Sequence, residues 1–192
     1  MKKRLFIAIN LPEEIKGKIE ADIREFKQVI EANLRGKIRW LPPENWHLTI
    51  TFLGYQPDDA IPAIIESLKS IAQNQTGNLR IDFDKISFGP IGKRPRMIWL
   101  VGTNETSKNL ALLKNKLEDE LVKNNVQFQR EKRGLGAAHI TLARFQVGQI
   151  NLSEVKFPKI GQIVFEAESL DLMESHLKRA GADYEILFSI SF

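Results

Sequence analysis

Apolar and polar positions along this chain follow periods that change from segment to segment. A short apolar run over residues 4–10 predicts a strand, and the β-branched and aromatic residues at 46–54, which end at Gly54, predict a second one. Apolar residues three and four positions apart predict amphipathic helices at 12–33, 58–73 and 104–124. Further strands are expected at 79–88, 97–101, from 138 onward, 162–175 and 184–191.

These elements follow one another in the order β-α-β-α-β-β-α-β-β-β, with no repeat period and no low-complexity linker. Because helices and strands are mixed and several strands join by short turns, an α+β fold with antiparallel sheets fits best. A length of 192 residues suits one domain over 1–192, or two small lobes that share an interface.

Composition removes several classes of chemistry. The chain has no cysteine, which excludes disulfides, thiolate chemistry and cysteine zinc sites. The apolar run after the N-terminal lysines, residues 5–9, is too short for a signal peptide, and no run approaches the roughly eighteen residues of a membrane span. We therefore expect a cytoplasmic protein that contacts no membrane.

The charge favours an anionic partner. The formal net charge is +4, and basic residues gather at 35–39, 92–96 and 129–134. Any one of these clusters fits a solvated loop. All three lie in stretches with Gly or Pro, where long basic side chains can converge on a cleft, so together they support a phosphate-bearing substrate.

Two of the three histidines lie in the same local pattern, "HLTI" at 47–50 and "HITL" at 139–142, about half a chain apart. Side chains alternate between the faces of a strand, so His47 shares a face with Thr49 and Thr51. The opposite face, which would enter the core, carries Leu48, Ile50 and Phe52. In the second motif, alternation places His139 with Thr141.

Two imidazoles facing each other suit acid–base chemistry. With an ordinary pKa near 6.5, one ring can be neutral and accept a proton while the other is charged and donates one. Each role is worth about 10²–10⁴ in rate, and threonine hydroxyls can donate to phosphate oxygens between them. No metal or other cofactor is required. A single such pattern is more often structural, and His176, with no threonine partner, is interpreted as a structural or surface residue.

On these motifs the chain resembles the two-histidine phosphoesterase superfamily, which carries paired His-x-Thr-x motifs on a duplicated α+β lobe. Within it, the chain is similar to the RNA 2′,3′-cyclic phosphodiesterases, also called 2′-5′ RNA ligases. The matching segments are "RLFIAINLP", "RWLPPENWHLTITFLG", "RMIWLVG", "AHITLAR" and "LMESHLKRAGADYEIL". The resemblance implies two similar lobes with antiparallel sheets that line a central cleft and helices on the outside.

The resemblance also implies an activity, the metal-independent hydrolysis of RNA 2′,3′-cyclic phosphate ends to 2′-phosphomonoesters by a monomeric enzyme. By carry-over, His47 is the proton donor to the leaving oxygen and His139 is the proton acceptor that activates water. Thr49, Thr141 and Arg144 are the phosphate-binding residues. Strict alternation would point Arg144 away from His139, five residues earlier, unless a bulge re-aims it.

The sequence departs from the family pattern before the second histidine, and two alternative functions are compatible with it. Family members usually have Pro immediately before the second His, whereas this chain has Ala138 after a stretch with two glycines at 134 and 136. We expect a more mobile loop there and an altered substrate preference, with the chemistry kept. The alternatives are 2′-5′ ligation of RNA ends such as tRNA halves, which needs the same residues, and a non-catalytic RNA-binding module.

Overall fold

The fold is described from a computed structural model that covers residues 2–34, 36–75, 77–91, 94–130, 136–178 and 181–192. The helices are α1 (Glu13–Asn33), α2 (Ile61–Asn74) and α3 (Asn104–Lys123), with 3₁₀ turns at Pro43–Asn45, Asp58–Ala60 and Leu152–Glu154. The strands are β1 (Lys2–Asn10), β2 (Ile38–Trp40), β3 (His47–Pro57), β4 (Leu79–Gly89), β5 (Met97–Gly102), β6 (His139–Phe145), β7 (Ile163–Ala167), β8 (Ser169–Lys178) and β9 (Gly181–Ser191).

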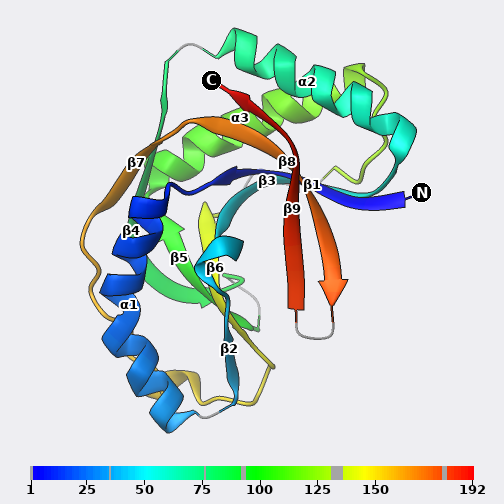
Figure 1. The fold of residues 1–192 in the computed structure, drawn as a ribbon. Coiled ribbons are helices and arrows are strands. Elements are labelled where there is room, and N and C mark those ends of the chain that lie inside the picture. Colours follow the sequence, from blue (N-terminus) through cyan, green and yellow to red (C-terminus); the bar gives the residue numbers. More distant parts are fainter. Residues whose placement is uncertain (1, 35, 76, 92–93, 131–135, 179–180) are drawn as a thin grey trace.

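The described strands form two antiparallel sheets (Figure 1). One sheet has the order β3-β1-β8-β9 and the other β2-β6-β5-β4-β7. The two histidine-bearing strands, β3 and β6, come into contact where the sheets meet. Helices α2 and α3 pack together; α2 contacts β8 and β9 of the first sheet, α3 contacts β3 of the first sheet and β4 and β5 of the second, and α1 lies along β7 of the second. The expected α+β fold with antiparallel sheets and outer helices is confirmed.

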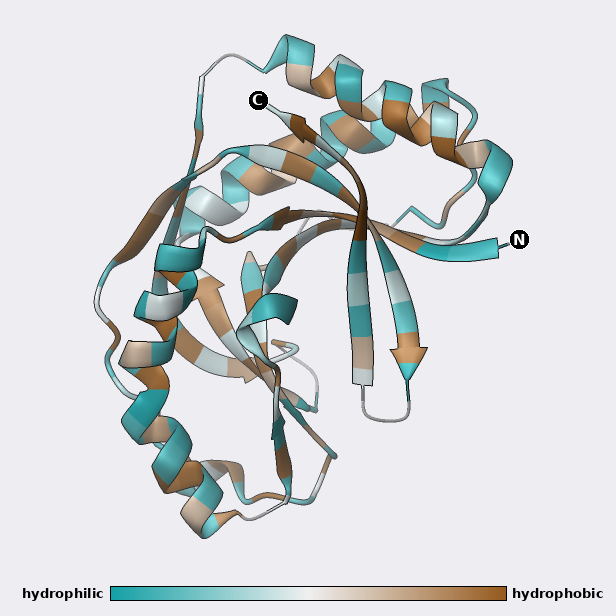
Figure 2. Ribbon diagram, in the orientation of Figure 1, coloured by the Kyte–Doolittle hydropathy of each residue, from teal (hydrophilic) through white to brown (hydrophobic). Residues whose placement is uncertain are grey.

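Helix α1 shows how apolar spacing becomes packing. Its buried side chains are Ile15, Ile19, Ile23, Phe26 and Ile30, which recur three and four residues apart on one face. In Figure 2, α1 shows hydrophobic (brown) and hydrophilic (teal) bands that alternate along the helix. The same core cluster includes Leu48 of β3 and Ile140 of β6, so the two sheets share it. None of the helices in the described part of the chain combines the length and apolar character needed to span a bilayer.

One expectation about the strands is wrong, and one strand was not expected. The segment at 162–175 is not one strand, because the chain leaves the five-stranded sheet after Ala167 and enters the four-stranded sheet at Ser169. Both parts have strand-like composition, so local pattern does not reveal the change of sheet. The three-residue strand β2, which pairs with β6, was also not expected, since its pattern is too short to register.

Candidate active site

A cleft of about 1180 Å³ brings together all of the residues that the sequence singled out for chemistry. Its lining includes His47, Thr49, His139, Thr141 and Arg144. The first two lie on β3 and the other three on β6, from the two sheets that meet there. The expected convergence of the two motifs in one cleft is therefore found in the fold.

Each histidine strand contains a β-bulge three residues after its histidine. On β3, Ile50 is the extra residue, because Thr49 pairs with Ala8 and Thr51 with Ile7. On β6, Leu142 is the extra residue between Thr141, which pairs with Trp99, and Ala143. A bulge shifts the alternation of faces by one residue. The side chain five residues after each histidine therefore turns back to the cleft.

The bulge on β6 explains how Arg144 reaches the site. Leu142 and Ala143 are both buried, and Arg144, next along the strand, is exposed and lines the cleft. The expectation that a bulge could re-aim this side chain agrees with the observed register. Its charge acts on both imidazoles, since Arg144 contributes to lowering the pKa of His47 and of His139.

The bulge on β3 overturns two expectations about faces. Thr51 does not accompany His47 and Thr49, because it is buried and its Oγ1 donates to Glu118 Oε1 at 2.8 Å. Phe52 does not enter the core. Its side chain is 56% exposed and lines the cleft, in the place on β3 that Arg144 occupies on β6. Simple alternation could not find Phe52, because the bulge that turns this side chain to the cleft depends on pairing with β1.

His47 is held by its backbone and by aromatic rings. Its Nδ1 lies 2.9 Å from the carbonyl oxygen of Asn45. A carbonyl can only accept, so Nδ1 carries the proton and Nε2 of the neutral ring is left with a lone pair. The ring of Phe6 lies 5.0 Å away, and that of Tyr184 lies 4.9 Å away with an edge-to-face orientation.

His139 repeats this arrangement with different neighbours. Its Nδ1 lies 2.9 Å from the carbonyl oxygen of Ala137, which fixes the same tautomer. The indole of Trp99 stacks on the imidazole with ring centroids 3.7 Å apart and planes 19° apart. Room for that indole depends on Gly89, where a Cβ would come within 2.1 Å of Trp99 Cδ2.

Burial lowers the pKa of both imidazoles. For His47, loss of solvent around the ring lowers the pKa to about 4, and the charges of Arg144 and His139 add to the effect against the opposing hydrogen bond to Asn45. Burial also lowers the pKa of His139, again with Arg144 contributing. Both rings are therefore neutral at pH 7 in the free protein.

The two threonines of the motifs lie beside their histidines in the cleft. Thr49 and Thr141 are both partly exposed there. The Oγ1 of Thr141 lies 3.9 Å from the sulfur of Met97, a weak acceptor that leaves the hydroxyl able to turn toward a better one.

A buried ionic network underlies the β3 side of the cleft. Glu118 of α3, with only 2% of its surface exposed, accepts hydrogen bonds from Thr51 and from Arg130 Nε at 3.0 Å. Its Oε1 also lies 3.4 Å from Lys114 Nζ. The network ties α3 to the strand that carries His47. Sequence pattern did not suggest it, because these residues look like ordinary helix-surface charges.

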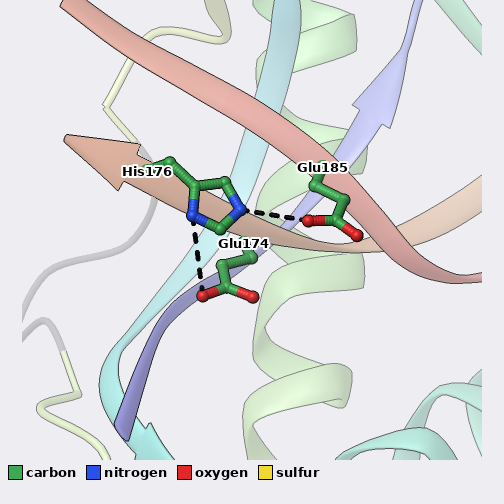
Figure 3. Close-up of side chains that lie close together, drawn as sticks. All are labelled: Glu174, His176 and Glu185. Atoms are coloured by element: carbon green, nitrogen blue, oxygen red, sulfur yellow. Dashed lines mark hydrogen bonds and ion pairs between the residues drawn. The ribbon is translucent and has the colours of Figure 1, made fainter. Parts of the chain in front are cut away.

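His176 lies outside this cleft, in agreement with its interpretation as a surface or structural residue. Figure 3 shows its ring between two carboxylates, with Nε2 3.1 Å from Glu185 and Nδ1 3.9 Å from Glu174. Glu174 also pairs with Lys3 Nζ at 2.6 Å. The three side chains could together hold a metal ion, but the observed contacts form a network of ion pairs and hydrogen bonds.

Parts of the expected basic surface fall outside the described residues. This applies to Arg35, to positions 92–93 and to positions 131–134. It also applies to most of the Pro-free loop that leads to His139, including Gly134. Of the basic residues in those clusters, Arg39 lines the cleft.

The two antiparallel sheets share a cleft, and each places a histidine and a threonine there, as the resemblance to two-histidine phosphoesterases implies. Comparison with known proteins agrees. A family model described as LigT like Phosphoesterase matches residues 10–99. An RNA 2′,3′-cyclic phosphodiesterase of Bacillus subtilis is 30% identical over 151 residues, covering 78% of this chain and 78% of that protein. The chain belongs to the LigT-like phosphoesterase family.

Further similarities extend over almost the whole chain. An RNA 2′,3′-cyclic phosphodiesterase of Methanocaldococcus jannaschii is 28% identical over 188 residues, covering 96% of this chain and 98% of that one. The crystal structure of E. coli LigT complexed with 3′-AMP matches with a TM-score of 0.74 at 23% identity, covering 100% and 98% of the two chains. A Thermus thermophilus protein, TT0787, matches with a TM-score of 0.70 at 24% identity, covering 98% and 97%. At these identities the two structures support the fold alone.

Proposed function

We propose that this protein hydrolyses the 2′,3′-cyclic phosphate at the end of an RNA to a 2′-phosphomonoester, with residues 1–192 acting as one two-lobed domain. The observation that carries the proposal is the convergence of His47 and His139 in one cleft, each with Nδ1 on a carbonyl oxygen. The names of the relatives, RNA 2′,3′-cyclic phosphodiesterases, support the same activity.

The two histidines take opposite roles in the proposed reaction. The Nε2 of His139 accepts a proton from water, whose oxygen attacks phosphorus. The bond from phosphorus to O3′ breaks as His47 donates a proton from Nε2 to that oxygen. The product has a 2′-phosphate and a free 3′-hydroxyl, and the proton taken up by His139 returns to solvent.

Charge on the phosphate is met by three side chains. The hydroxyls of Thr49 and Thr141 donate to its non-bridging oxygens, and the guanidinium of Arg144 offsets the negative charge that builds up in the transition state. Because these donors and the two imidazoles suffice for the chemistry, the proposed reaction uses no metal ion.

The proton donor has to be charged when the substrate binds. In the free protein burial holds the pKa of His47 to about 4, so the imidazole is neutral at pH 7. A phosphodiester anion placed between the two rings favours the imidazolium form and raises that pKa. Substrate binding and proton uptake by His47 are thus coupled in this proposal.

The aromatic side chains give the substrate's base a place to lie. Phe52 is exposed in the cleft, and its ring centroid is 6.0 Å from that of Phe6. A nucleobase can stack on such a ring whatever its sequence, with about 1–3 kcal/mol per stacked base. This favours a nucleotide as the class of substrate.

The test is turnover of an RNA that ends in a 2′,3′-cyclic phosphate, measured in EDTA with the product identified. We expect a 2′-phosphate product, and a loss of at least about 10²-fold in kcat for His47→Ala and for His139→Ala. The matched control is His176→Ala, at the one histidine outside the cleft, which should keep its rate. Absence of turnover, or equal rates for all three variants, would contradict the proposal.

The same assay separates the two alternatives. Ligation would appear as a 2′-5′ joined product when excess RNA with a 5′-hydroxyl is added. A binding module would bind RNA tightly with no product, and the binding would be unaffected by either histidine substitution.

A further inference from the structure

Arg4 lines the far part of the same cleft, beyond the aromatic residues around His47. It lies two residues before Phe6 on β1, so the two side chains share a face of the strand. Arg4 is partly buried, and its Nη1 donates to the hydroxyl of Ser175 on β8 at 3.2 Å. Ser175 is itself buried, with 8% of its surface exposed, and lines the cleft beside Arg4.

Unlike Lys114 and Lys178, which also line this cleft, the guanidinium of Arg4 has no carboxylate partner among the described residues. Lys178 pairs with Asp183, and Lys114 lies near Glu118. Among the described residues, the one hydrogen-bond partner of the Arg4 guanidinium is the neutral hydroxyl of Ser175. A guanidinium that is partly removed from water and has no counter-charge is a ready binding site for an anion.

Strand geometry keeps Glu174 away from Arg4, and Asp183, an acidic residue that does line the cleft, pairs with Lys178. Lys3 precedes it on β1 and therefore points to the opposite face, where it binds Glu174. Glu174 joins His176 and Glu185 in the cluster of Figure 3, and none of these three residues lines the cleft. The positive charge of Arg4 is thus left for a ligand in the cleft.

The position of Arg4 relative to His47 suits the spacing of phosphates in RNA. The ring of Phe6 lies 5.0 Å from His47, and two residues along a strand advance about 6–7 Å further. A nucleotide whose cyclic phosphate lies at the histidines and whose base lies over Phe52 would direct its 5′ side along β1. The group there is the next phosphate.

We propose that Arg4, supported by Ser175, forms a second phosphate-binding site that recognises the 5′-phosphate of the nucleotide carrying the cyclic phosphate. This site rests on the proposed function for the orientation of the substrate. It would make the enzyme prefer an end within an RNA chain, or a 5′-phosphorylated nucleotide, over a nucleoside 2′,3′-cyclic phosphate.

The test uses two substrates that differ by one phosphate. These are adenosine 2′,3′-cyclic phosphate with a 5′-hydroxyl and the same nucleotide with a 5′-phosphate. For the unmodified protein, kcat/KM should be about tenfold higher with the 5′-phosphate, as expected for one charge-assisted hydrogen bond of about 1.4 kcal/mol. Arg4→Gln should abolish this difference and leave the rate on the 5′-hydroxyl substrate within about twofold.

Further variants guard against a general effect on folding. Arg4→Lys should keep part of the preference, because the charge remains. Ser175→Asp should remove the preference although Arg4 is still present, because the new carboxylate forms an ion pair with the guanidinium. Lys85→Gln, at an exposed lysine outside the cleft, is the matched control for lost charge and should keep the full preference.

A binding measurement separates failure of this site from failure of the proposed reaction. Calorimetry compares adenosine 2′,5′-bisphosphate with adenosine 2′-monophosphate, and tighter binding of the bisphosphate that Arg4→Gln removes would support the site even without turnover. Equal binding of the two ligands by the unmodified protein would overturn the proposal. An Arg4→Gln variant that loses affinity equally for both ligands, or kcat/KM equally for both substrates, would also overturn it.

Discussion

The imidazoles of His47 and His139 are oriented by the same kind of contact, a hydrogen bond to a nearby backbone carbonyl. In each case Nδ1 lies 2.9 Å from the carbonyl oxygen of the residue two positions earlier. That contact depends only on the backbone at the start of the strand, so Asn45 and Ala137 can serve equally well. It leaves both Nε2 atoms free for chemistry, and the different rings that surround them allow their pKa values to differ.

The first prediction concerns the proton on His47. Its pKa of about 4 in the free protein means that the bound phosphate must raise that pKa before the ring can donate. We therefore expect uptake of up to one proton when a 2′-phosphorylated nucleotide binds at pH 7, and less uptake in His47→Gln. Calorimetry in buffers with different ionisation enthalpies measures this, and an unchanged heat across buffers would contradict it.

The second prediction concerns Phe52. Replacing its exposed ring by Ala removes the proposed stacking surface, which is worth about 1–3 kcal/mol, or roughly 5- to 150-fold in kcat/KM. Phe52→Trp should keep most of the activity, because it keeps an aromatic face. The fold should be little affected, since the side chain is 56% exposed. A phosphate diester without a nucleobase serves as the control substrate, and kcat/KM for this substrate should fall much less in Phe52→Ala.

At the scale of strands, the two bulges decide which side chains face the cleft. They lie at Ile50 and Leu142, in the same place relative to each histidine. The sequence contains no direct signal for a bulge, because each segment reads as an ordinary strand. The bulges depend on pairing with β1 and β5, which are distant in sequence. This is why alternation alone misplaced Thr51 and Phe52.

The third prediction tests how β4 and β5 position His139. A methyl group at Gly89 would overlap the indole of Trp99, which stacks on the imidazole. Gly89→Ala should therefore displace Trp99 and lower kcat, whereas Gly17→Ala, at a helical glycine with open space around its Cα, should not. The tryptophan fluorescence of the protein, to which Trp40 and Trp46 also contribute, and the rate should change together. A normal rate with an altered tryptophan environment would contradict the positioning role.

At the scale of the whole molecule, stability and the site depend on the same contacts. Glu118 joins α3 to β3 through Thr51 and lies close to Lys114 and Arg130. Removal of one member of a buried ionic network typically costs about 3–5 kcal/mol. We expect Glu118→Ala to lower the free energy of unfolding by that order, measured in urea. Glu154→Ala, in an exposed turn, is the control and should change it by less than about 0.5 kcal/mol.

The last prediction concerns acid stability. The pKa of His47 is about 4 when folded and near 6.5 when unfolded, so the unfolded chain takes up the proton first as pH falls. The free energy of unfolding should therefore fall between about pH 6.5 and 4, with His47 contributing at most about 3 kcal/mol. His139 acts in the same direction. His47→Gln should show a smaller loss between pH 7 and 5 in urea titrations, and an equal loss would contradict this source.

The sequence by itself determined most of the local elements and which residues are proposed for the chemistry. Apolar spacing is enough to predict α1 and β3, and two His-x-Thr patterns among three histidines point to acid–base catalysis. These follow from periods of a few residues, which a linear chain displays directly.

Tertiary structure alone decided which distant residues meet. The change of sheet between β7 and β8, the bulges, and the enclosure of His47 by Phe6 and Tyr184 all depend on contacts between segments far apart in the chain. The pKa of His47 depends on the same packing, because burial is its main cause. The local sequence records which side chains are present. Their exposure to solvent, their contact partners and the direction in which they point are set only when the two sheets come together.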